Sequence, residues 1–557
     1  MKIRTSLALG LSLWMALSLT SCGQGDGSQS SGASEGAAAV HAESGSESEN
    51  AAVQANAVTL AYYSAEGLHP YTCDNAANQI ITGLIYEPLF EINDSFETEP
   101  CLALSGTSKV VSASGPQSED TGEGDTSEGD QSDGSEEDAA KSQRSKIAGK
   151  TVCTIELRTD VQFSDGTSMT ASDVVYSLEQ AAKAGSIYAD RLADVESVQA
   201  SGESTVVVNL NAADAAFETL LDIPIIKNGT GGARFPVGTG PYQVKTKDGE
   251  AKKLTKNASW WQEGSLPVQE VGLYVAEDSD MLIFGFGSGA VSMVATDLTG
   301  TSSLTYTGEY NVVDYPTTSL IYVGCNTRSG ACQSKGLRQV LNYAFDRETL
   351  TTKMLSGHAE PAALPVSPKS KLYDEKLAEK YAWSEEKATE ALQDAAYYGR
   401  TLKLIVNSES TFKTAFAAEL EKELEAVGID VKVEELNWKD FSEALENRDF
   451  DLYLGEVKLT ANFDLTELIT EEGNLNYGGY SNSDLEELLT KFLTASSEKR
   501  AAAASKLYQA LAEDAPIIPL CFKNNSVLTH WDAEAAITPT QQNLFYHFSD
   551  WDLTPGV

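Results

Sequence analysis

Apolar and polar positions along this chain follow two different periods in turn, and the changes between them predict its elements. Alternation at every second position predicts strands, and apolar residues three and four positions apart predict helices. The predicted strands are 58–63, 152–157, 205–210, 402–406, 430–435, 450–454 and an extended segment at 516–520. The predicted helices are 78–89, 170–184, 214–221, 334–345, 384–396, 411–427, 441–446, 483–495 and 497–513. This mixture along the whole length predicts an α/β protein of a size suited to two lobes.

The first residues carry a different signal. Lys2 and Arg4 precede an apolar stretch at 6–20, which has the length of a secretory signal and is short for a membrane span. Leu19-Thr20-Ser21-Cys22 resembles a bacterial lipobox. This resemblance implies cleavage before Cys22 and its diacylation, with 1–21 as signal peptide and 22–56 as a lipidated, flexible tether. We therefore expect an extracytoplasmic protein anchored by lipid to the bacterial cell membrane; a soluble secretory signal with a chance cysteine is the alternative.

The charge of the chain excludes some partners. The formal net charge is −42, and removal of 1–21 takes away Lys2 and Arg4, which leaves −44 on 557 − 21 = 536 residues. So acidic a chain repels nucleic acid and anionic lipid. Acidic residues are concentrated in the segment 112–140, which has ten carboxylates, no basic residue and few apolar residues. We predict a disordered acidic insertion at 112–148, a solvated loop rather than a cation site or spacer.

Cysteine and histidine give no metal site. Apart from Cys22 there are six cysteines without the paired close spacing of a zinc site, and only five histidines, which are scattered. Metal binding and other cofactors are therefore not expected. Export permits disulfides. Cys101 and Cys153 flank the acidic insertion and would come close if it is an excursion from a hairpin, but the pairing stays open among Cys73, Cys101, Cys153, Cys325, Cys332 and Cys521.

Several segments, taken in order, resemble a known family. They are 85–90 (IYEPLF), 157–175 with its Phe163-Ser164-Asp165-Gly166-Thr167 turn, 238–242 (GTGPY), 336–347 (GLRQVLNYAFDR) and 513–519 (EDAPIIP). Together they are similar to the extracytoplasmic solute-binding proteins of peptide and nickel ABC transporters. The glycines, prolines and Asp-Gly of these segments suit turns, so they indicate a fold rather than a ligand.

The resemblance implies a fold and a function. The fold is a two-lobed periplasmic-binding-protein type with a hinged cleft, with lobe 1 at 57–320, lobe 2 at 321–519 and a return to lobe 1 at 520–557. The function is that of a monomeric receptor that encloses a peptide or other small polar solute and delivers it to an ABC transporter permease. A sensory lipoprotein that binds a peptide on the same fold is the alternative, and the sequence does not separate the two.

The resemblance also suggests solute contacts in lobe 2. Trp438 lies in a segment whose tryptophan borders the cleft in relatives, and Arg448 falls where some peptide binders have an arginine. Relatives often place an aspartate after the strand at 450–458 to receive the peptide α-amino group, and this chain has no carboxylate clearly there. Glu456 and Lys458 share one face of an extended strand, and Asp464 could replace the missing acid. Core packing for the tryptophan and solvated positions for the charged residues are the alternatives.

In lobe 1, the loop and helix start that border the cleft in relatives offer Tyr71, Asn75 and Asn78 as polar contacts. Trp260 and Trp261 are more consistent with packing. An exported hydrolase is disfavoured, since the chain has no Gly-x-Ser-x-Gly elbow, no His-Glu-x-x-His pair and no catalytic cysteine setting. The protein is therefore predicted to be a binding protein and not an enzyme.

Overall fold

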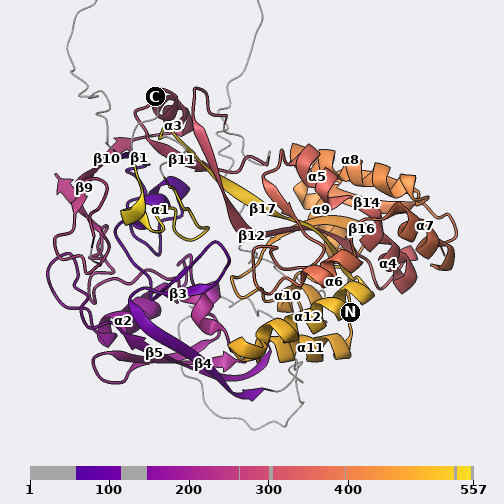
Figure 1. Cartoon of the computed structure of the whole chain (residues 1–557), viewed down its shortest axis with the longest axis horizontal. Helices are drawn as coiled ribbons and strands as arrows, with labels where there is room; N and C mark the ends of the chain where they lie inside the picture. Colours follow the sequence, from indigo (N-terminus) through magenta and orange to yellow (C-terminus); the bar gives the residue numbers. More distant parts are fainter. Residues whose placement is uncertain are drawn as a thin grey trace, which may run out of the picture.

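The computed structural model describes residues 58–113, 147–262, 264–299, 305–395, 397–531 and 536–553. These residues form a mixed α/β molecule with two lobes, joined by the long strands β12 (Asn311–Cys325) and β17 (Ile517–Thr529), which run from one lobe into the other (Figure 1). Lobe 1 comprises the residues before the middle of β12 and those after the middle of β17. Lobe 2 comprises the residues between these two points. We propose that the boundaries lie near residues 320 and 519.

Lobe 1 contains two four-stranded sheets with the orders β1-β10-β9-β8 and β4-β5-β7-β6, and the small pair β2-β3. Only β1 and β10 in these sheets are parallel. The strands are β1 Val58–Tyr62, β2 Phe90–Ile92, β3 Thr98–Pro100, β4 Ala103–Ala113, β5 Ala148–Leu157, β6 Val195–Ala200, β7 Thr205–Ala212, β8 Tyr242–Lys247, β9 Glu250–Lys256 and β10 Glu270–Val275. The helices are α1 Ala76–Thr82, α2 Ala171–Ala181 and α3 Ser279–Gly287, with 3₁₀ turns η1 Asp190–Leu192, η2 Phe217–Leu220 and η5 Phe548–Asp550.

Lobe 2 is built on a seven-stranded sheet in the order β11-β17-β12-β16-β14-β15, with β13 paired to β17. Its further strands are β11 Met293–Thr296, β13 Ala359–Pro361, β14 Leu402–Asn407, β15 Val431–Leu436 and β16 Leu452–Lys458. The helices are α4 Lys335–Ala344, α5 Arg347–Met354, α6 Glu375–Lys380, α7 Glu385–Asp394, α8 Thr411–Ala426, α9 Trp438–Asn447, α10 Thr466–Ile469, α11 Ser483–Leu493 and α12 Ser497–Asp514, with the 3₁₀ turn η3 Ala331–Gln333. The lobe 1 strand β11 joins this sheet through β17, so the sheet itself crosses from lobe to lobe.

Buried apolar side chains of the described residues form two cores in lobe 1 and two in lobe 2. One lobe 2 core holds side chains of α4, α7 and α8, and the other holds those of α9, α11 and α12. The second of these also includes four lobe 1 residues, namely Ile92, Phe96, Ile147 and Ala213. The two lobes therefore share apolar packing beside the crossover strands.

The crossover strands are irregular at the point where they change lobes. Their antiparallel register is interrupted between Pro316 and Leu320. Proline has no N–H to donate to the ladder, which favours such an interruption. The interruption therefore marks the place at which the two halves of each strand can bend independently.

Most of the predicted elements are present, but several differ in length, and the extended segment predicted at 516–520 is only the start of the 13-residue β17. The predicted helix at 78–89 is the seven-residue α1, which ends at Gly83, and the helix predicted at 214–221 is only the 3₁₀ turn η2. The helix predicted at 441–446 begins earlier, because Asn437 caps it, and becomes α9. The acidic insertion follows β4 and precedes β5, which pair as a hairpin, and most of it lies outside the described residues.

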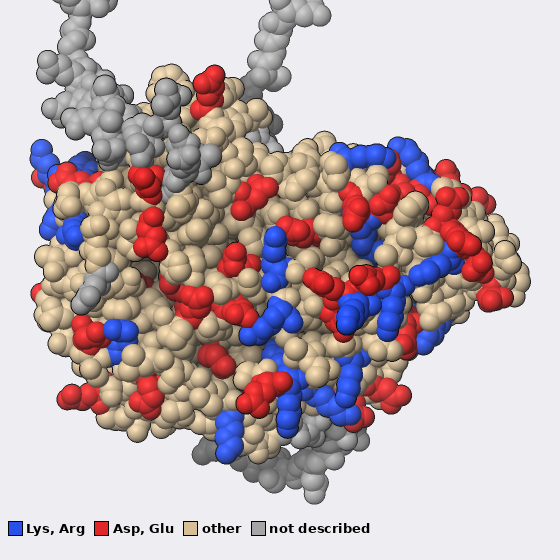
Figure 2. Space-filling view, viewed as in Figure 1, with Lys and Arg blue, Asp and Glu red and all other residues tan. Residues whose placement is uncertain are grey.

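The described surface shows both signs of charge. On the face in Figure 2, basic and acidic side chains are interspersed over lobe 2 rather than gathered into a patch of one sign. Within the described part of the chain, no helix combines the length and the apolar character that crossing a bilayer requires. Residues 1–57, which include the predicted signal and tether, lie outside that part.

Candidate functional site

The candidate site begins at one edge of the lobe 2 sheet. Strands β14, β15 and β16 are parallel, so their carboxyl ends meet at the same edge. The helices α8 and α9 leave this edge on opposite faces of the sheet, since their apolar residues belong to different cores. Open α/β sheets bind ligands in the crevice outside such an edge, where the connections diverge. The fold therefore brings Trp438, Glu456 and Lys458 to one edge.

Trp438 is the first residue of α9, directly after β15. The side chain of Asn437 caps this helix by accepting a hydrogen bond from the Asp440 N–H (3.0 Å). The Trp438 ring is 37% exposed, and its centroid lies 6.2 Å from that of Phe441. The backbone N–H of Trp438 donates to a carboxylate oxygen of Glu409 (3.1 Å). The ring is thus held at its base but presents a face to solvent.

Glu456 lies in a chain of alternating charges at the crossover. Its carboxylate accepts from Lys413 of α8 (2.8 Å) and from Lys523 of β17 (3.1 Å). Lys523 is buried and also pairs with Asp297, which follows β11. Burial alone would raise the pKa of Glu456, but the charges of Lys413 and Lys523 outweigh it and lower the pKa to about 2. Glu456 is therefore a constant negative charge that links lobe 2 to the crossover strand.

Lys458 ends β16 and faces lobe 1. Its side chain is exposed to solvent, yet desolvation and then the charge of Arg191 lower its pKa, while Asp222 acts in the opposite sense. Both residues that influence it belong to lobe 1, where Arg191 pairs with Asp222 and lies over the Tyr188 ring (5.3 Å to the centroid). A cation from each lobe thus meets across the space between them.

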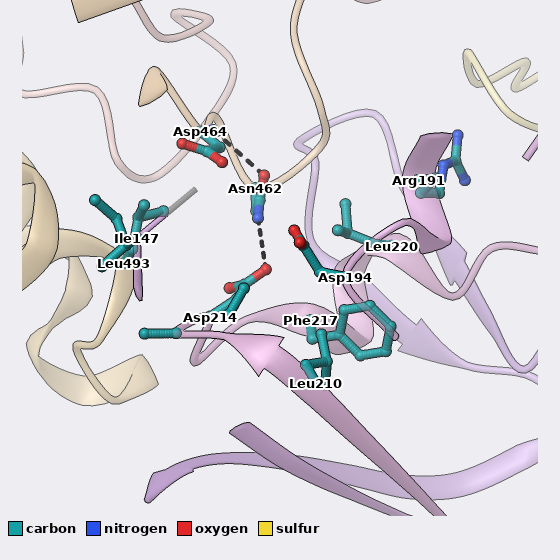
Figure 3. A pocket seen from close by; sticks show the side chains of 12 residues that line it. Ile147, Arg191, Asp194, Leu210, Asp214, Phe217, Leu220, Asn462, Asp464 and Leu493 are labelled. Atoms are coloured by element: carbon teal, nitrogen blue, oxygen red, sulfur yellow. Dashed lines mark hydrogen bonds between the residues drawn. The ribbon is translucent and has the colours of Figure 1, made fainter. Parts of the chain in front are cut away.

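Two small cavities border the Arg191–Asp222 pair. The first, of about 30 Å³, lies between the lobes and includes Arg191 in its lining. As Figure 3 shows, Asn462 lies within hydrogen-bonding distance of Asp214, to which its amide donates across the lobes (3.0 Å). Burial raises the pKa of Asp214 to about 6. Asp464 also lines this cavity, and its carboxylate accepts from the N–H of Thr466 (2.9 Å).

The second cavity, of about 120 Å³, is formed by lobe 1 residues and includes Tyr188 and Asp222 in its lining. Its other polar lining residues are Gln79, Thr82, Glu91, Gln542 and Asn543. Burial raises the pKa of Glu91, which accepts a hydrogen bond from Asn543 (3.0 Å). The lining around the Arg191–Asp222 pair is therefore mixed, with amides and carboxylates suited to hydrogen bonding among apolar side chains.

Comparison with known proteins decides the family. The model of the bacterial extracellular solute-binding proteins, family 5 (middle region), matches residues 136–464. The chain belongs to this family. Its members bind solutes outside the cytoplasm and are not enzymes, which confirms the predictions of an extracytoplasmic binding protein without catalytic activity.

Individual relatives are distant but cover most of this solute-binding protein. The oligopeptide-binding protein AppA of Bacillus subtilis is 24% identical over 450 residues, which is 73% of this chain and 81% of AppA. The solved structure of the ABC transporter substrate-binding protein CtaP of Listeria monocytogenes matches with a TM-score of 0.66 at 20% identity, over 89% of this chain and 99% of CtaP. The B. subtilis AppA structure, in complex with a nonapeptide, matches with a TM-score of 0.52 at 21% identity, over 89% of this chain and 97% of AppA. These structures confirm the two-lobed fold.

Four residues predicted as solute contacts occupy other places in this solute-binding protein. Arg448 ends α9 in a left-handed conformation (φ 55°), about 15 Å along the helix from Trp438, and its carbonyl accepts from Asn326 (3.0 Å). Tyr71 is buried and donates to the Pro224 carbonyl (2.7 Å). The structure does not bring these two to the sheet edge described above.

Asn75 and Asn78 organise the start of α1. Asn75 caps the helix by accepting from the Asn78 N–H (3.1 Å). The Asn78 side chain is fully buried, accepts from the Tyr63 N–H and donates to the carbonyls of Tyr63 and Gly67 (all 2.8 Å). Its hydrogen-bonding groups are therefore used in holding the 63–67 loop.

The sequence analysis suggested Tyr71, Asn75 and Asn78 in lobe 1, but it did not single out Arg191, Asp222 or the crossover residue Lys523. Arg191 and Asp222 are far apart in sequence and belong to no motif, so only folding brings them together. The sequence did contain a sign that Lys523 has a role, because it is the one charged residue in the strand 517–529 (IIPLCFKNNSVLT). A lone charge in a buried strand needs a partner, which here is supplied by Glu456 and Asp297.

The cysteines of the described residues are all buried and carry no disulfide. The hairpin expected around the acidic insertion is present, but Cys153 lies opposite Ser108, and Cys101 precedes the first paired residue of β4. These two cysteines are therefore not register partners. Within the described ranges, no group of three or more histidine, cysteine, aspartate or glutamate residues is arranged to hold a metal ion. Cys22 lies outside those ranges.

Proposed function

We propose that this protein is the lipid-anchored receptor of an ABC importer, which captures a peptide or peptide-like solute between its lobes and delivers it to a membrane permease. The observation that carries the proposal is the two-lobed fold of the family together with a cavity that is lined by charged and polar groups of both lobes, such as Arg191 of lobe 1 and Asp464 of lobe 2. A solute that contacts both sides binds the closed form better than the open form. That difference in affinity is what drives hinge closure.

A peptide is the favoured solute for two reasons. The relative AppA is named an oligopeptide-binding protein, and its solved structure holds a nonapeptide. In this chain, Trp438 offers an exposed aromatic face at the sheet edge, which suits stacking on a side chain or on peptide backbone. We propose Trp438, Glu456, Lys458 and Asp464 as the lobe 2 residues that border the solute.

Solute entry requires the lobes to separate. The two cavities near Arg191, of about 30 and 120 Å³, are smaller than the roughly 300–1,000 Å³ of typical ligand pockets. The register interruption between Pro316 and Leu320 supplies a place for bending. We propose opening about the crossover strands, capture, and closure as the binding cycle.

The anchor part of the proposal rests on the first residues of the sequence. Two acyl chains on Cys22 would retain the protein at the membrane, which a single chain does only marginally. Tethering would also keep the receptor at high local concentration near its permease. In the native host, replacement of residues 1–22 by a secretory signal that is cleaved without lipidation should move the protein from the membrane fraction to the soluble extracytoplasmic fraction. Retention of the variant in the membrane fraction would contradict the anchor.

The solute is tested by identifying what the protein carries. The full chain, purified in detergent, is denatured, the released small molecules are identified by mass spectrometry, and each candidate is added back in a thermal-shift assay. We expect a set of peptides that raise the melting temperature. A single non-peptide solute would refute the peptide assignment and leave receptor function intact.

A matched pair of variants tests the cleft. Trp438→Ala should weaken binding of the recovered peptides by roughly tenfold, since loss of an aromatic contact costs on the order of 1–2 kcal/mol. Trp383→Ala is the control, because Trp383 is similarly exposed (48%) and lies between α6 and α7. Equal binding by both variants would remove Trp438 from the site.

A further inference from the structure

Two of the six buried cysteines of the described residues lie together at the lobe 2 end of β12. Cys325 is the last residue of β12, and Cys332 is the middle residue of η3, so six residues separate them. Both side chains are fully buried and belong to the same lobe 2 core. Contact with the Cys325 thiol, and then burial, raises the pKa of the Cys332 thiol.

Backbone hydrogen bonds bring the two cysteines together independently of that contact. The residues that directly follow Cys325 and precede Cys332 both bind Asp451. The Asn326 N–H donates to the Asp451 carbonyl (2.9 Å), and the Ala331 N–H donates to the Asp451 carboxylate (3.3 Å). The two ends of the turn 326–331 are therefore held by one residue, which makes Cys325 and Cys332 neighbours in space.

The sequence of the turn suits this closure. The Asn326 side chain accepts hydrogen bonds from the N–H groups of Arg328 (3.1 Å) and Ser329 (3.0 Å), which reverses the chain. Gly330 has a φ of 75°, and a Cβ at this position would lie 2.2 Å from a carboxylate oxygen of Asp451. Glycine is therefore required where the turn meets Asp451.

A second set of contacts holds both cysteines against the segment before β17. The Cys325 N–H donates to the Pro516 carbonyl (3.0 Å). Arg338 donates to the Cys332 carbonyl (2.9 Å) and to the Asp514 carbonyl (2.8 Å). The backbones on both sides of the thiol pair are therefore fixed close together, and a bond that matches an existing arrangement avoids the strain that a distorted disulfide stores.

We propose that Cys325 and Cys332 form a disulfide in the exported protein, which closes the turn 326–331 covalently. The chain belongs to an extracytoplasmic family, and disulfides persist outside the cytoplasm. The oxidant is the disulfide of an exported thiol–disulfide oxidoreductase. One cysteine attacks it as a thiolate and forms a mixed disulfide, from which the second cysteine then displaces the carrier. One S–S bond forms and one breaks, and the carrier is reduced to two thiols that take up the two protons.

This exchange takes place before the lobe 2 core closes. The thiolate is the attacking species, and burial together with the raised pKa of Cys332 leaves little thiolate in the folded protein. The bond therefore forms while the exported chain folds, and burial then protects it from reductants.

The disulfide lies at the end of the sheet away from the candidate solute site. Cys325 pairs with Leu452, the first residue of β16, whereas Lys458 is the last residue of that strand. Solute binding should therefore be the same with and without this bond.

The test is the state of each cysteine in the full chain, exported by its host and purified in detergent without reductant. Free thiols are alkylated with iodoacetamide in urea, and trypsin then cuts after Arg328, between the two cysteines. We expect peptide 329–335 to be linked to the peptide that ends at Arg328, with a mass two hydrogens below their sum, and to be released by reductant. Cys521 belongs to the same core, and as the internal control it should be alkylated.

Alkylation of both Cys325 and Cys332 without reductant would refute the disulfide, and so would linkage of either one to another cysteine. A second readout is the melting temperature of the chain refolded from urea with or without a phosphine reductant. Reduction should lower it by roughly 5 °C, because the bond constrains the unfolded chain. The decrease should be absent in Cys325→Ala/Cys332→Ala and retained in the control Cys153→Ala. An equal decrease in the double variant would contradict the proposal, since the bond responsible would then lie elsewhere.

Discussion

At the scale of single residues, several of the segments that resemble the family have a structural role, because their side chains and glycines allow close packing. The indole N–H groups of Trp260 and Trp261 donate to the two carboxylate oxygens of Glu87 (2.9 and 3.0 Å). A Cβ on Gly238 would lie 2.2 Å from the Ile85 carbonyl oxygen, and one on Gly240 would lie 2.6 Å from the Ile85 carbonyl carbon. These segments are therefore held by close approach of backbones and by one buried acid, although Tyr86 and Pro88 of the first segment also line the 120 Å³ cavity.

Glu87 predicts a pH effect on stability. Burial raises its pKa to about 7, from an ordinary 4.5, although the two tryptophans act in the opposite sense. The folded state therefore favours the neutral acid, and its contribution to stability is fully present below about pH 4.5 and is lost as pH rises through 7. The variant Glu87→Gln should be less stable to urea than wild type at pH 5, because one indole loses its acceptor. Between pH 5 and 8, its free energy of unfolding should decrease less than that of wild type. An unchanged pH profile would contradict the assignment.

Glu456 predicts the opposite pH effect. Its folded pKa of about 2 lies below its ordinary 4.5, so its contribution to stability is present above about pH 4.5 and is lost as pH falls toward 2. Glu456→Gln should lower the free energy of unfolding at pH 7 by about 1–3 kcal/mol, since Lys523 loses a charged partner. The loss relative to wild type should shrink below pH 4.5.

The control for this measurement is Glu390→Gln, which changes an exposed carboxylate on α7 that has no ion pair among the described residues. Its unfolding free energy should follow wild type at every pH, because solvated surface charges contribute little. A loss in Glu456→Gln that is the same at pH 3 and pH 7 would show that packing, and not the ion pairs, causes it.

At the scale of elements, the β4–β5 hairpin explains how a long acidic insertion is tolerated. The two strands pair from Ala103 opposite Leu157 to Ala113 opposite Gly149, and β7 covers the other edge of β5. The register of the hairpin is therefore specified by its own ladder and by its neighbour in the sheet. The insertion leaves and returns at adjacent ends of paired strands.

Removal of 114–146 should therefore leave the fold intact. Replacement of these residues by a short Gly-Asn-Gly loop should change the melting temperature by no more than a few degrees, since loop length enters stability only weakly. The measurement is thermal unfolding followed by circular dichroism, with solute binding as a second readout. Failure of this variant to fold would show that the insertion has a structural role.

At the scale of the whole molecule, the lobes meet along a seam beside the crossover strands. Phe96 of lobe 1 packs edge-on against Phe463 of lobe 2 (5.3 Å between centroids), and the Ala215 N–H donates to the Leu493 carbonyl (2.8 Å). The Asn462 amide donates to the half-buried Asp214 in the same seam. These contacts oppose opening, so their strength sets how often the cleft is accessible.

Asn462→Ala should therefore favour the open form. Loss of one buried hydrogen bond shifts the equilibrium by about 1 kcal/mol, and Asp214 is left without that donor. Small-angle scattering without added solute should show a radius of gyration increased by roughly 1 Å on roughly 24 Å. Asn447→Ala is the control, because Asn447 is exposed and bonds only within α9. Identical scattering from both variants and wild type would exclude the seam as a latch.

Much of the fold could be predicted from local pattern. The helices α4, α7, α8, α11 and α12 follow their apolar spacing and caps closely, because each has a clear amphipathic face. The helix predicted at 78–89 failed because Gly83 ends it and Tyr86 instead donates to the carbonyls of Leu68 and Pro236. For the candidate site, the sequence suggested residues of both lobes, but it did not single out Arg191 and Asp222. Trp438, Glu456 and Lys458 follow strands that the sequence reveals, whereas Arg191 and Asp222 do not.

The sequence by itself determined the α/β class, the family landmarks, the alternation that places Glu456 and Lys458 on one face, and the lipobox-like start. These properties depend on residues within a few positions of one another in the sequence, so they can be predicted from the local pattern. Only the tertiary structure decided that Lys523 joins Glu456 to Asp297, that Lys458 faces Arg191, and that Asn78 and Tyr71 serve lobe 1 itself. Such pairings join residues more than sixty positions apart, or they use the hydrogen-bonding groups of one loop, and their energies exist only once the chain has folded around them.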